Sequence, residues 1–215
     1  MRIERHRLDP RDLNDARSLS WSKIKTQELQ LSPSPIALTE SVSPYMAKTT
    51  GHGVINKLNV QMTHNGTTLS IRLSWPDPDK DDELADLDQF SDAIAVMFPL
   101  VEGASAFSMG SADKPVNAWF WKADESEPYD VLAKGYATSR KRPANLSDLT
   151  ANSYYSDGGW VVVLQRPLLS NDEELVSLKP GNESAIAFAV WEGSNAERSA
   201  QKAVSGEFME LAIDG

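Results

Sequence analysis

HNGTTLSIRLSW, residues 64–75, decides the fold class of this chain. Its Asn65-Gly66 pair is a strong signal for a β-hairpin, because both residue types tolerate the positive φ angles of a tight turn. Beyond the turn, apolar and polar residues alternate, so one face of the predicted strand is apolar. That face carries Leu69, Ile71, Leu73 and Trp75. VINKLNVQM, at 54–62, supplies the partner strand of an antiparallel hairpin with one buried face.

Six further strand-like segments follow, separated by turns rich in Gly, Pro, Asn, Asp and Ser. They are DAIAVMFP (92–99), VNAWFWKA (116–123), VLAKGYATS (131–139), GWVVVLQRPL (159–168), SAIAFAVWEG (184–193) and AVSGEFMELAI (203–213). DAIAVMFP is apolar on both faces, as a central buried strand is. Helical periodicity is weak, and only 82–90 and 195–202 resemble a helical turn or two. The pattern predicts an all-β fold, an antiparallel β-sandwich with a few short helices.

The chain divides by composition near residue 35. Residues 1–35 are polar and lack a regular period, and they end in SPSP. We expect an irregular N-terminal arm over 1–35 that contacts a partner subunit, followed by one sandwich domain over 36–215. A length of 215 residues with 40% hydrophobic content is sufficient for one large domain with a sizeable core.

Composition excludes several classes of function. A formal net charge of −10 argues against a nucleic-acid partner, which needs clustered Lys and Arg. The absence of cysteine excludes disulfides, Fe–S clusters held by this chain, zinc–thiolate sites and covalent haem attachment. No apolar run is long enough for a membrane span. The N-terminus, MRIERHRLDPRDL, has no apolar signal region, so either a signal was removed or the chain is exported with a signal-bearing partner.

The acidic run PDPDKDDELADLD at 76–88 begins like an EF-hand calcium loop. Its sixth position is Asp82 instead of Gly and its twelfth is Asp88 instead of Glu, so a solvated loop is the favoured interpretation. His52 and His64 lie beside glycines, where histidines are usually structural. No nucleophile elbow or glycine-rich phosphate loop is present, and no catalytic residue is predicted.

AFSMGSADKPVNAWFWKAD, at 106–124, places Met109 beside Gly110 at a predicted turn, just before Trp119 and Trp121. The two tryptophans share one face of their strand. They could fill the core, form a platform for sugars, or line the pocket of a large flat cofactor. Composition does not choose among these, and Met109 alone is an ordinary loop methionine.

Five stretches of the sequence, taken together, resemble a known family. In chain order they are SPYMAKTTGHGVINKL (43–58), HNGTTLSIRLSW (64–75), SMGSADKPVNAWFWKA (108–123), IAFAVWEGSNAERS (186–199) and KAVSGEF (202–208). This set resembles the haem-carrying γ subunits of molybdenum enzymes that hydroxylate hydrocarbons anaerobically, with ethylbenzene dehydrogenase the best match. Related γ subunits occur in dimethylsulfide dehydrogenase and in selenate and chlorate reductases.

The resemblance implies a sandwich that binds one non-covalent haem b. The family's axial methionine lies in the MG turn, which here is Met109, and its axial lysine follows NAERS, which here is Lys202. In this interpretation Gly110 lets the backbone approach the flat ligand, and Arg198 pairs with a haem propionate or with a partner subunit. Trp119 and Trp121 form either the pocket wall or the core beneath it.

The resemblance also implies a role in a complex. The chain would be a non-catalytic electron-transfer subunit in a heterotrimer with a Mo-bis-molybdopterin catalytic α subunit and an Fe–S β subunit. It would pass electrons to a soluble cytochrome c-type acceptor in the periplasm. The substrate would be a hydrocarbon or a sterol side chain, chosen on the α subunit. Two alternatives remain at this point: a carbohydrate-binding sandwich without haem, and a haem sensor or storage domain acting alone.

Overall fold

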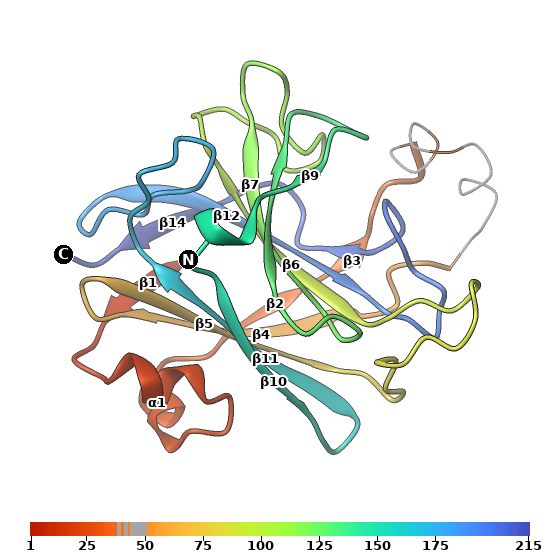
Figure 1. The fold of residues 1–215 in the computed structure, drawn as a ribbon, viewed down its shortest axis with the longest axis horizontal. Helices are drawn as coiled ribbons and strands as arrows, with labels where there is room; N and C mark the ends of the chain where they lie inside the picture. Colours follow the sequence, from red (N-terminus) through yellow and green to blue (C-terminus); the bar gives the residue numbers. More distant parts are fainter. Residues whose placement is uncertain (38–39, 41–42, 44–50) are drawn as a thin grey trace.

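Two layers of β-strands face each other across a hydrophobic core (Figure 1). The computed structural model describes residues 1–37, 40, 43 and 51–215. The strand pairs within each layer are antiparallel, which confirms the predicted all-β sandwich. Helical segments with described bounds are α1 (Pro10–Asn14), η1 (Leu19–Lys23) and η3 (Ala144–Leu146). None of the described helices is long and apolar enough to cross a membrane.

The first layer contains the predicted hairpin. Its strands in spatial order are β10 (Thr150–Tyr155), β11 (Gly159–Pro167), β5 (Thr68–Pro76) and β4 (Lys57–His64), with β2 (Gln27–Gln30) beside β4. In the hairpin turn Gly66 has a φ of 102°. The side-chain oxygen of Asn65 accepts hydrogen bonds from the backbone N–H groups of Thr67 and Thr68, at 3.0 and 2.9 Å. This turn sets the register that buries the apolar face of β5.

The second layer is built around β6, the predicted central strand. Its strands in order are β12 (Glu183–Trp191), β6 (Ala93–Pro99), β7 (Val116–Lys122), β8 (Tyr129–Ala133) and β9 (Arg140–Lys141). On the other side of β12 lie β13 (Ala203–Val204) and β3 (Ser32–Pro33). The segments 82–90 and 195–202 form turns and not the helical turns expected.

Two strands from opposite ends of the chain join the layers. β1 (Arg2–Arg5) lies between β4 and β14 (Met209–Ile213) and pairs in parallel with both. β14 then pairs antiparallel with β12. The ladder is therefore continuous, and the sandwich is one open sheet folded over on itself (Figure 1).

Residues 1–35 are not irregular as expected, and their expected contact with a partner subunit stays a prediction. Besides β1, β2 and β3, this segment supplies α1 and η1, which cover the outer face of the first layer. A small apolar cluster forms there from Leu13, Ala16, Trp21, Ile24 and Val163. The Gln61 side chain donates hydrogen bonds to the carbonyls of Trp21 and Ile24, at 2.8 and 2.7 Å. The few apolar residues of this segment occur at irregular spacing in short elements. The sequence therefore shows neither a helical nor a strand period, although the segment packs against the first layer.

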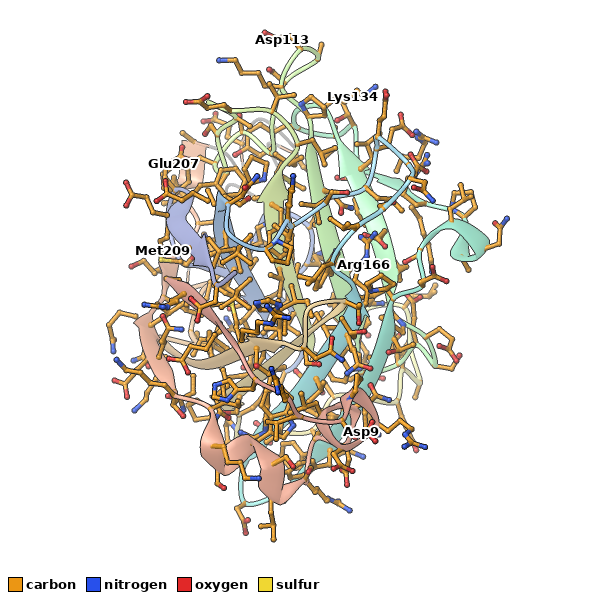
Figure 2. All side chains as sticks on the ribbon, turned by 90° about the vertical axis from the view of Figure 1, so that its left-hand side faces the viewer. Asp9, Asp113, Lys134, Arg166, Glu207 and Met209 are labelled. Atoms are coloured by element: carbon orange, nitrogen blue, oxygen red, sulfur yellow. The ribbon has the colours of Figure 1, made fainter. Side chains whose placement is uncertain are left out.

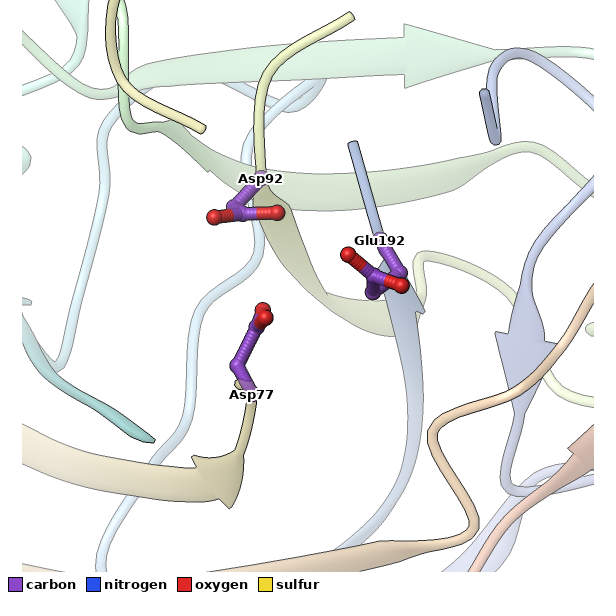
Figure 3. A group of neighbouring side chains, drawn as sticks. All are labelled: Asp77, Asp92 and Glu192. Atoms are coloured by element: carbon purple, nitrogen blue, oxygen red, sulfur yellow. The ribbon is translucent and has the colours of Figure 1, made fainter. Parts of the chain in front are cut away.

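Buried carboxylates lie where three strands end. Asp77 follows β5, Asp92 precedes β6 and Glu192 follows β12, and one oxygen of each lies within 4.8 Å of the others (Figure 3). Asp77 and Asp92 are 0% exposed. Indole N–H groups from the core donate to them, from Trp75 to Asp77 at 3.3 Å and from Trp160 to Asp92 at 2.8 Å. Among the described residues, no lysine or arginine forms an ion pair with any of the three.

Burial raises the pKa of Asp77 to about 8, and the neighbouring carboxylates Asp92 and Glu192 add to the shift. The pKa values of Asp92 and Glu192 are raised as well, chiefly by burial. The folded chain therefore holds protons here that the unfolded chain has released.

The first prediction concerns β1. Ile3 is 0% exposed, so Ile3→Ala is expected to lower the free energy of unfolding by about 3 kcal/mol, the cost of a buried cavity, as measured by urea titration. The matched control is Ile36→Ala, at a side chain that is 57% exposed, with a change below about 0.5 kcal/mol. Equal, small effects in both variants would mean that the N-terminal strand does not belong to the core.

The second prediction concerns pH. Because the pKa of Asp77 is raised in the folded state, its ionisation destabilises the fold as pH rises from about 4 towards 8. Asp77→Asn removes this titration and is expected to flatten the pH dependence of the unfolding free energy, by up to ~1.4 kcal/mol per pH unit, and to stabilise the chain at pH 8. The exposed neighbour Asp79→Asn is the control. An Asp77→Asn variant less stable than wild type at pH 8 would contradict this, since it would indicate a carboxylate stabilised by a cation.

Candidate functional site

The outer face of the second layer is made largely of small side chains. Along β6, β7 and β12, alternate residues point away from the core. Strand pairing aligns these residues in rows across the layer. One row is Ala187, Met97, Ala118 and Val131, and the next is Ala189, Ala95, Phe120 and Tyr129. The alanines leave a recessed strip along the middle of the layer.

This strip is the floor of a cavity of about 640 Å³. The volume is in the range of pockets that hold cofactors. Aromatic rings border the floor: Phe120 stacks on Tyr129 with ring centres 5.3 Å apart, and its ring centre is 4.9 Å from that of Trp191. A recessed apolar floor with aromatic sides suits a large, flat, apolar ligand.

Met109 lines this cavity from the loop between β6 and β7. Its φ is 55°, a left-handed conformation that costs a residue other than glycine about 1 kcal/mol. Its backbone N–H donates to the carbonyl of Ala106 at 3.1 Å, and its carbonyl accepts from the N–H of Gly135 at 3.0 Å. Hydrogen bonds on both sides therefore hold the loop that presents the thioether.

Lys202 lines the same cavity, one residue before β13. Its Nζ lies 4.7 Å from the centre of the Trp191 ring. Within the part of the chain that the structure describes, no carboxylate forms an ion pair with it. Burial lowers the pKa of its amine to about 8, which makes the neutral, metal-binding form easier to reach than for an exposed lysine.

The loop that leads to Lys202 is held by Glu197, whose carboxylate accepts hydrogen bonds from the backbone N–H groups of Gly53 and Val54, at 2.6 and 3.1 Å. Arg198, next in the chain, lines the cavity. Its guanidinium lies 4.5 Å from the centre of the Phe90 ring and donates to the carbonyl of Ala196 at 2.8 Å. Among described residues no carboxylate forms an ion pair with Arg198, which leaves its charge for an anionic group in the cavity.

The structure thus brings Met109, Lys202 and Arg198 to one cavity, but Trp119 and Trp121 do not line it. Strand alternation sends Phe120 to the cavity and both tryptophans to the core. There Trp119 packs against Phe98, with ring centres 5.0 Å apart. Of the two roles expected for these tryptophans, the core beneath the pocket is the one observed.

Gly110 does not line the cavity either. Its φ is 78°, and a Cβ at this position would lie 2.6 Å from the carbonyl oxygen of Lys114. The loop's own backbone therefore requires glycine here, and the expected approach of Gly110 to a ligand stays a prediction.

Of the other methionine and histidine side chains that could bind a metal, only some are near the cavity. Met97 lies on the cavity floor, whereas Met62 is in the core. His64 accepts a hydrogen bond at Nδ1 from the N–H of Gly66, at 3.1 Å, and His52 donates from Nε2 to the carbonyl of Ser34, at 2.8 Å. Met46 lies outside the described residues.

Sequence reasoning missed the floor itself and the rings of Phe120 and Trp191. A signal was present, since alanine occupies every second position in parts of DAIAV (92–96) and IAFA (186–189). On one face of a strand, such a run marks a surface that must leave room for something.

The donor set fits a non-covalently held haem. The thioether of Met109 offers a sulfur donor and the neutral amine of Lys202 a nitrogen donor, and iron binds both kinds of atom. The chain has no cysteine for covalent attachment of a haem. The apolar floor suits the face of a porphyrin, and the guanidinium of Arg198 suits a carboxylate at its edge.

Solved structures with similar folds include a family 9 carbohydrate-binding module of Caldicellulosiruptor kristjanssonii, with a TM-score of 0.55 and 11% identity over 100% of this chain and 95% of that one. A Bacteroides uniformis protein named for carbohydrate binding has a TM-score of 0.59 and 8% identity, over 100% and 98%. At these identities the likeness shows the sandwich fold alone.

Proteins related in sequence point to a narrower group than the proteins of similar fold do. The chain is 36% identical to the chlorate reductase subunit gamma of Ideonella dechloratans, over 89% of this chain and 76% of that one. It is 35% identical to a protein of Haloferax mediterranei described as a respiratory nitrate reductase heme subunit, over 87% and 64%. It is 33% identical to the dimethylsulfide dehydrogenase subunit gamma of Rhodovulum sulfidophilum, over 69% and 57%. The chain therefore spans less than two thirds of the length of two of these relatives.

The family model for ethylbenzene dehydrogenase matches residues 18–146 and 143–203, which include Met109 and Lys202. Together with the γ subunits of oxidoreductases found among its relatives, this match confirms the resemblance seen in the sequence. The chain belongs to the ethylbenzene dehydrogenase family.

Proposed function

We propose that the chain is an electron-transfer subunit that carries one non-covalent haem b, with Met109 and Lys202 as the two axial ligands of the iron. The observation that carries the proposal is their convergence. A thioether and an amine of lowered pKa, 93 residues apart in the chain, line one cavity above a floor of alanines. The relative described as a heme subunit supports the choice of cofactor.

Each residue has a defined part in this role. The bound haem supplies a one-electron Fe(III)/Fe(II) couple. The soft thioether of Met109 would favour the reduced metal and would raise the reduction potential. Lys202 must lose a proton to coordinate, and its burial has already lowered the cost of doing so. With both Met109 and Lys202 bound, the iron would have no position left for a substrate, so the site would serve electron transfer.

Arg198 is proposed to pair with a haem propionate. Its guanidinium is held by stacking on Phe90 and by a hydrogen bond to the Ala196 carbonyl, so its charge is positioned before the ligand arrives. The two lysines on the opposite part of the lining, Lys122 and Lys141, are already paired with Asp124 and Glu125.

The proposed context is a heterotrimer. The catalytic reaction would take place on a Mo-bis-molybdopterin α subunit, and an Fe–S β subunit would deliver electrons to this chain. A soluble cytochrome c-type protein would accept them in the periplasm, where the chain would be exported with a signal-bearing partner. This proposal is supported by the similarity to γ subunits of chlorate reductase and dimethylsulfide dehydrogenase. We further propose hydrocarbon or sterol hydroxylation as the reaction of the complex, and the match to the ethylbenzene dehydrogenase family model supports the hydrocarbon.

A carbohydrate-binding module without haem is the competing function. The fold is compatible with it, and Phe120, Tyr129 and Trp191 give the cavity an aromatic surface. However, sugars need many hydrogen-bond partners, and the alanine floor provides none. A purified chain that binds glucans but stays colourless with haemin would favour the carbohydrate reading.

The third prediction tests the ligands. Met109→Ala and Lys202→Ala are each expected to change the axial ligation of the haem-loaded chain, seen as a new low-temperature EPR spectrum, because each removes one iron ligand. Met109→Ala should also lower the midpoint potential. The controls are Met209→Leu and Lys179→Ala, whose side chains do not line the cavity. A variant with an unaltered spectrum would show that its residue is not a ligand, and Met97 would be the next donor to replace.

The fourth prediction tests the floor. Ala95→Phe places a ring on the alanine floor of the cavity. It is expected to weaken haemin uptake at least tenfold, measured by absorbance titration. The unfolding free energy of the haem-free chain should change by less than about 1 kcal/mol, because the new ring enters an existing cavity. Ala212→Phe, on the exposed side of β14, is the control. Unchanged uptake in Ala95→Phe would place the haem elsewhere.

A further inference from the structure

Glu207 connects the two sides of the cavity. It lies five residues after Lys202, beyond β13, and its side chain reaches the loop that carries Met109. One carboxylate oxygen accepts a hydrogen bond from the hydroxyl of Ser105, and the other accepts one from the backbone N–H of Ala106 at 2.8 Å. Figure 2 shows Glu207 near the edge of the molecule, where its side chain is exposed to solvent.

Glu207 is itself firmly placed. Two residues earlier, the N–H of Ser205 donates to the carbonyl of Phe188 at 3.0 Å, and the Ser205 hydroxyl oxygen accepts from the N–H of Phe188 at 2.9 Å. Phe188 belongs to β12, the strand that carries part of the alanine floor. The segment that carries Glu207 is therefore tied to the sheet on which the cavity is built.

The two residues that Glu207 holds are the ones that shape the methionine turn. The carbonyl of Ala106 accepts the N–H of Met109 at 3.1 Å, and the carbonyl of Ser105 accepts the N–H of Gly110 at 3.0 Å. Fixing Ser105 and Ala106 thus fixes both acceptors of the turn. Met109 is in a left-handed conformation, which a loop without such support would tend to leave.

We propose that Glu207 is a positioning residue that holds the Met109 thioether in place for iron by tying its loop to the segment that carries Lys202. The inference rests on the proposed function, because positioning matters only if Met109 is a ligand. Among the hydrogen bonds of the described residues, the two made by Glu207 are the ones that join the loop 104–110 to the segment 203–207. The contacts from Gly135 and Tyr136 reach the loop from the other side and are left intact when Glu207 is changed.

The test uses Glu207→Ala, with Glu210→Ala as a matched control on the neighbouring strand β14. In the haem-free chain, the amide hydrogens of Met109 and Gly110 are expected to exchange roughly tenfold faster in Glu207→Ala and at the wild-type rate in Glu210→Ala, since charge-assisted hydrogen bonds are lost. In the haem-loaded chain, Glu207→Ala should show a second EPR population that lacks methionine ligation and a lower midpoint potential.

Two more variants grade the effect. Ser105→Ala removes one of the two contacts and should give a smaller change in the same direction. Glu207→Gln keeps one acceptor oxygen and should restore part of the wild-type spectrum, which a merely destabilised fold would not do. Wild-type exchange rates in Glu207→Ala, or faster exchange with an unchanged spectrum, would overturn the inference. A wild-type chain that takes up no haemin would instead overturn the proposed function, and the exchange rates would still decide whether Glu207 holds the turn.

Discussion

Side-chain alternation along β6, β7 and β12 is the constraint on which the rest of the structure depends. The same strands fill the core with one face and form the cavity floor with the other. In β7, Trp119 and Trp121 point into the core, whereas Ala118 before them and Phe120 between them point into the cavity. A shift of one residue in any of these strands would bury its outward-facing alanines and turn its large core residues into the cavity, which in β7 are Trp119 and Trp121. Core packing and an open site are therefore fixed by one register.

The two outer faces of the sandwich differ in what covers them. The N-terminal segment covers the outer face of the first layer, with Leu13 and Trp21 packed on Val163. Within the described ranges, the corresponding face of the second layer is bordered by loops, and these carry Met109 and Lys202. The described residues thus cover one outer face and form a cavity on the other. A chain that covered both faces would be a sandwich without a binding site.

Much of the fold could be predicted because local signals agreed with the tertiary structure. The Asn65-Gly66 turn and the alternation after it are local features, and both appear as expected. The N-terminal strand could not be predicted, because β1 has four residues and is stabilised by parallel pairing with strands about 60 and 210 residues away. Ile3 alone reaches the core, and a single buried residue has no period to detect.

The site was predictable only in part. No spacing rule brings Met109 to Lys202, since their approach depends on the folding of two distant loops around one sheet; the family resemblance identified them. For Trp119 and Trp121 the sequence left both the pocket wall and the core beneath it open, and the structure places them in the core. The backbone of its own loop accounts for glycine at position 110. The alanine rows were not predicted, although the alternation of alanine in β6 and β12 marks the floor more directly than the tryptophans do.

X-ray absorption at the iron edge of the haem-loaded chain tests the central claim most directly. The account predicts one sulfur scatterer in the first coordination shell, from Met109, with five nitrogens from the porphyrin and Lys202. A first shell of nitrogen and oxygen alone, or a five-coordinate iron, would contradict it, because the thioether and the amine that line the cavity would then not be the pair that holds the metal.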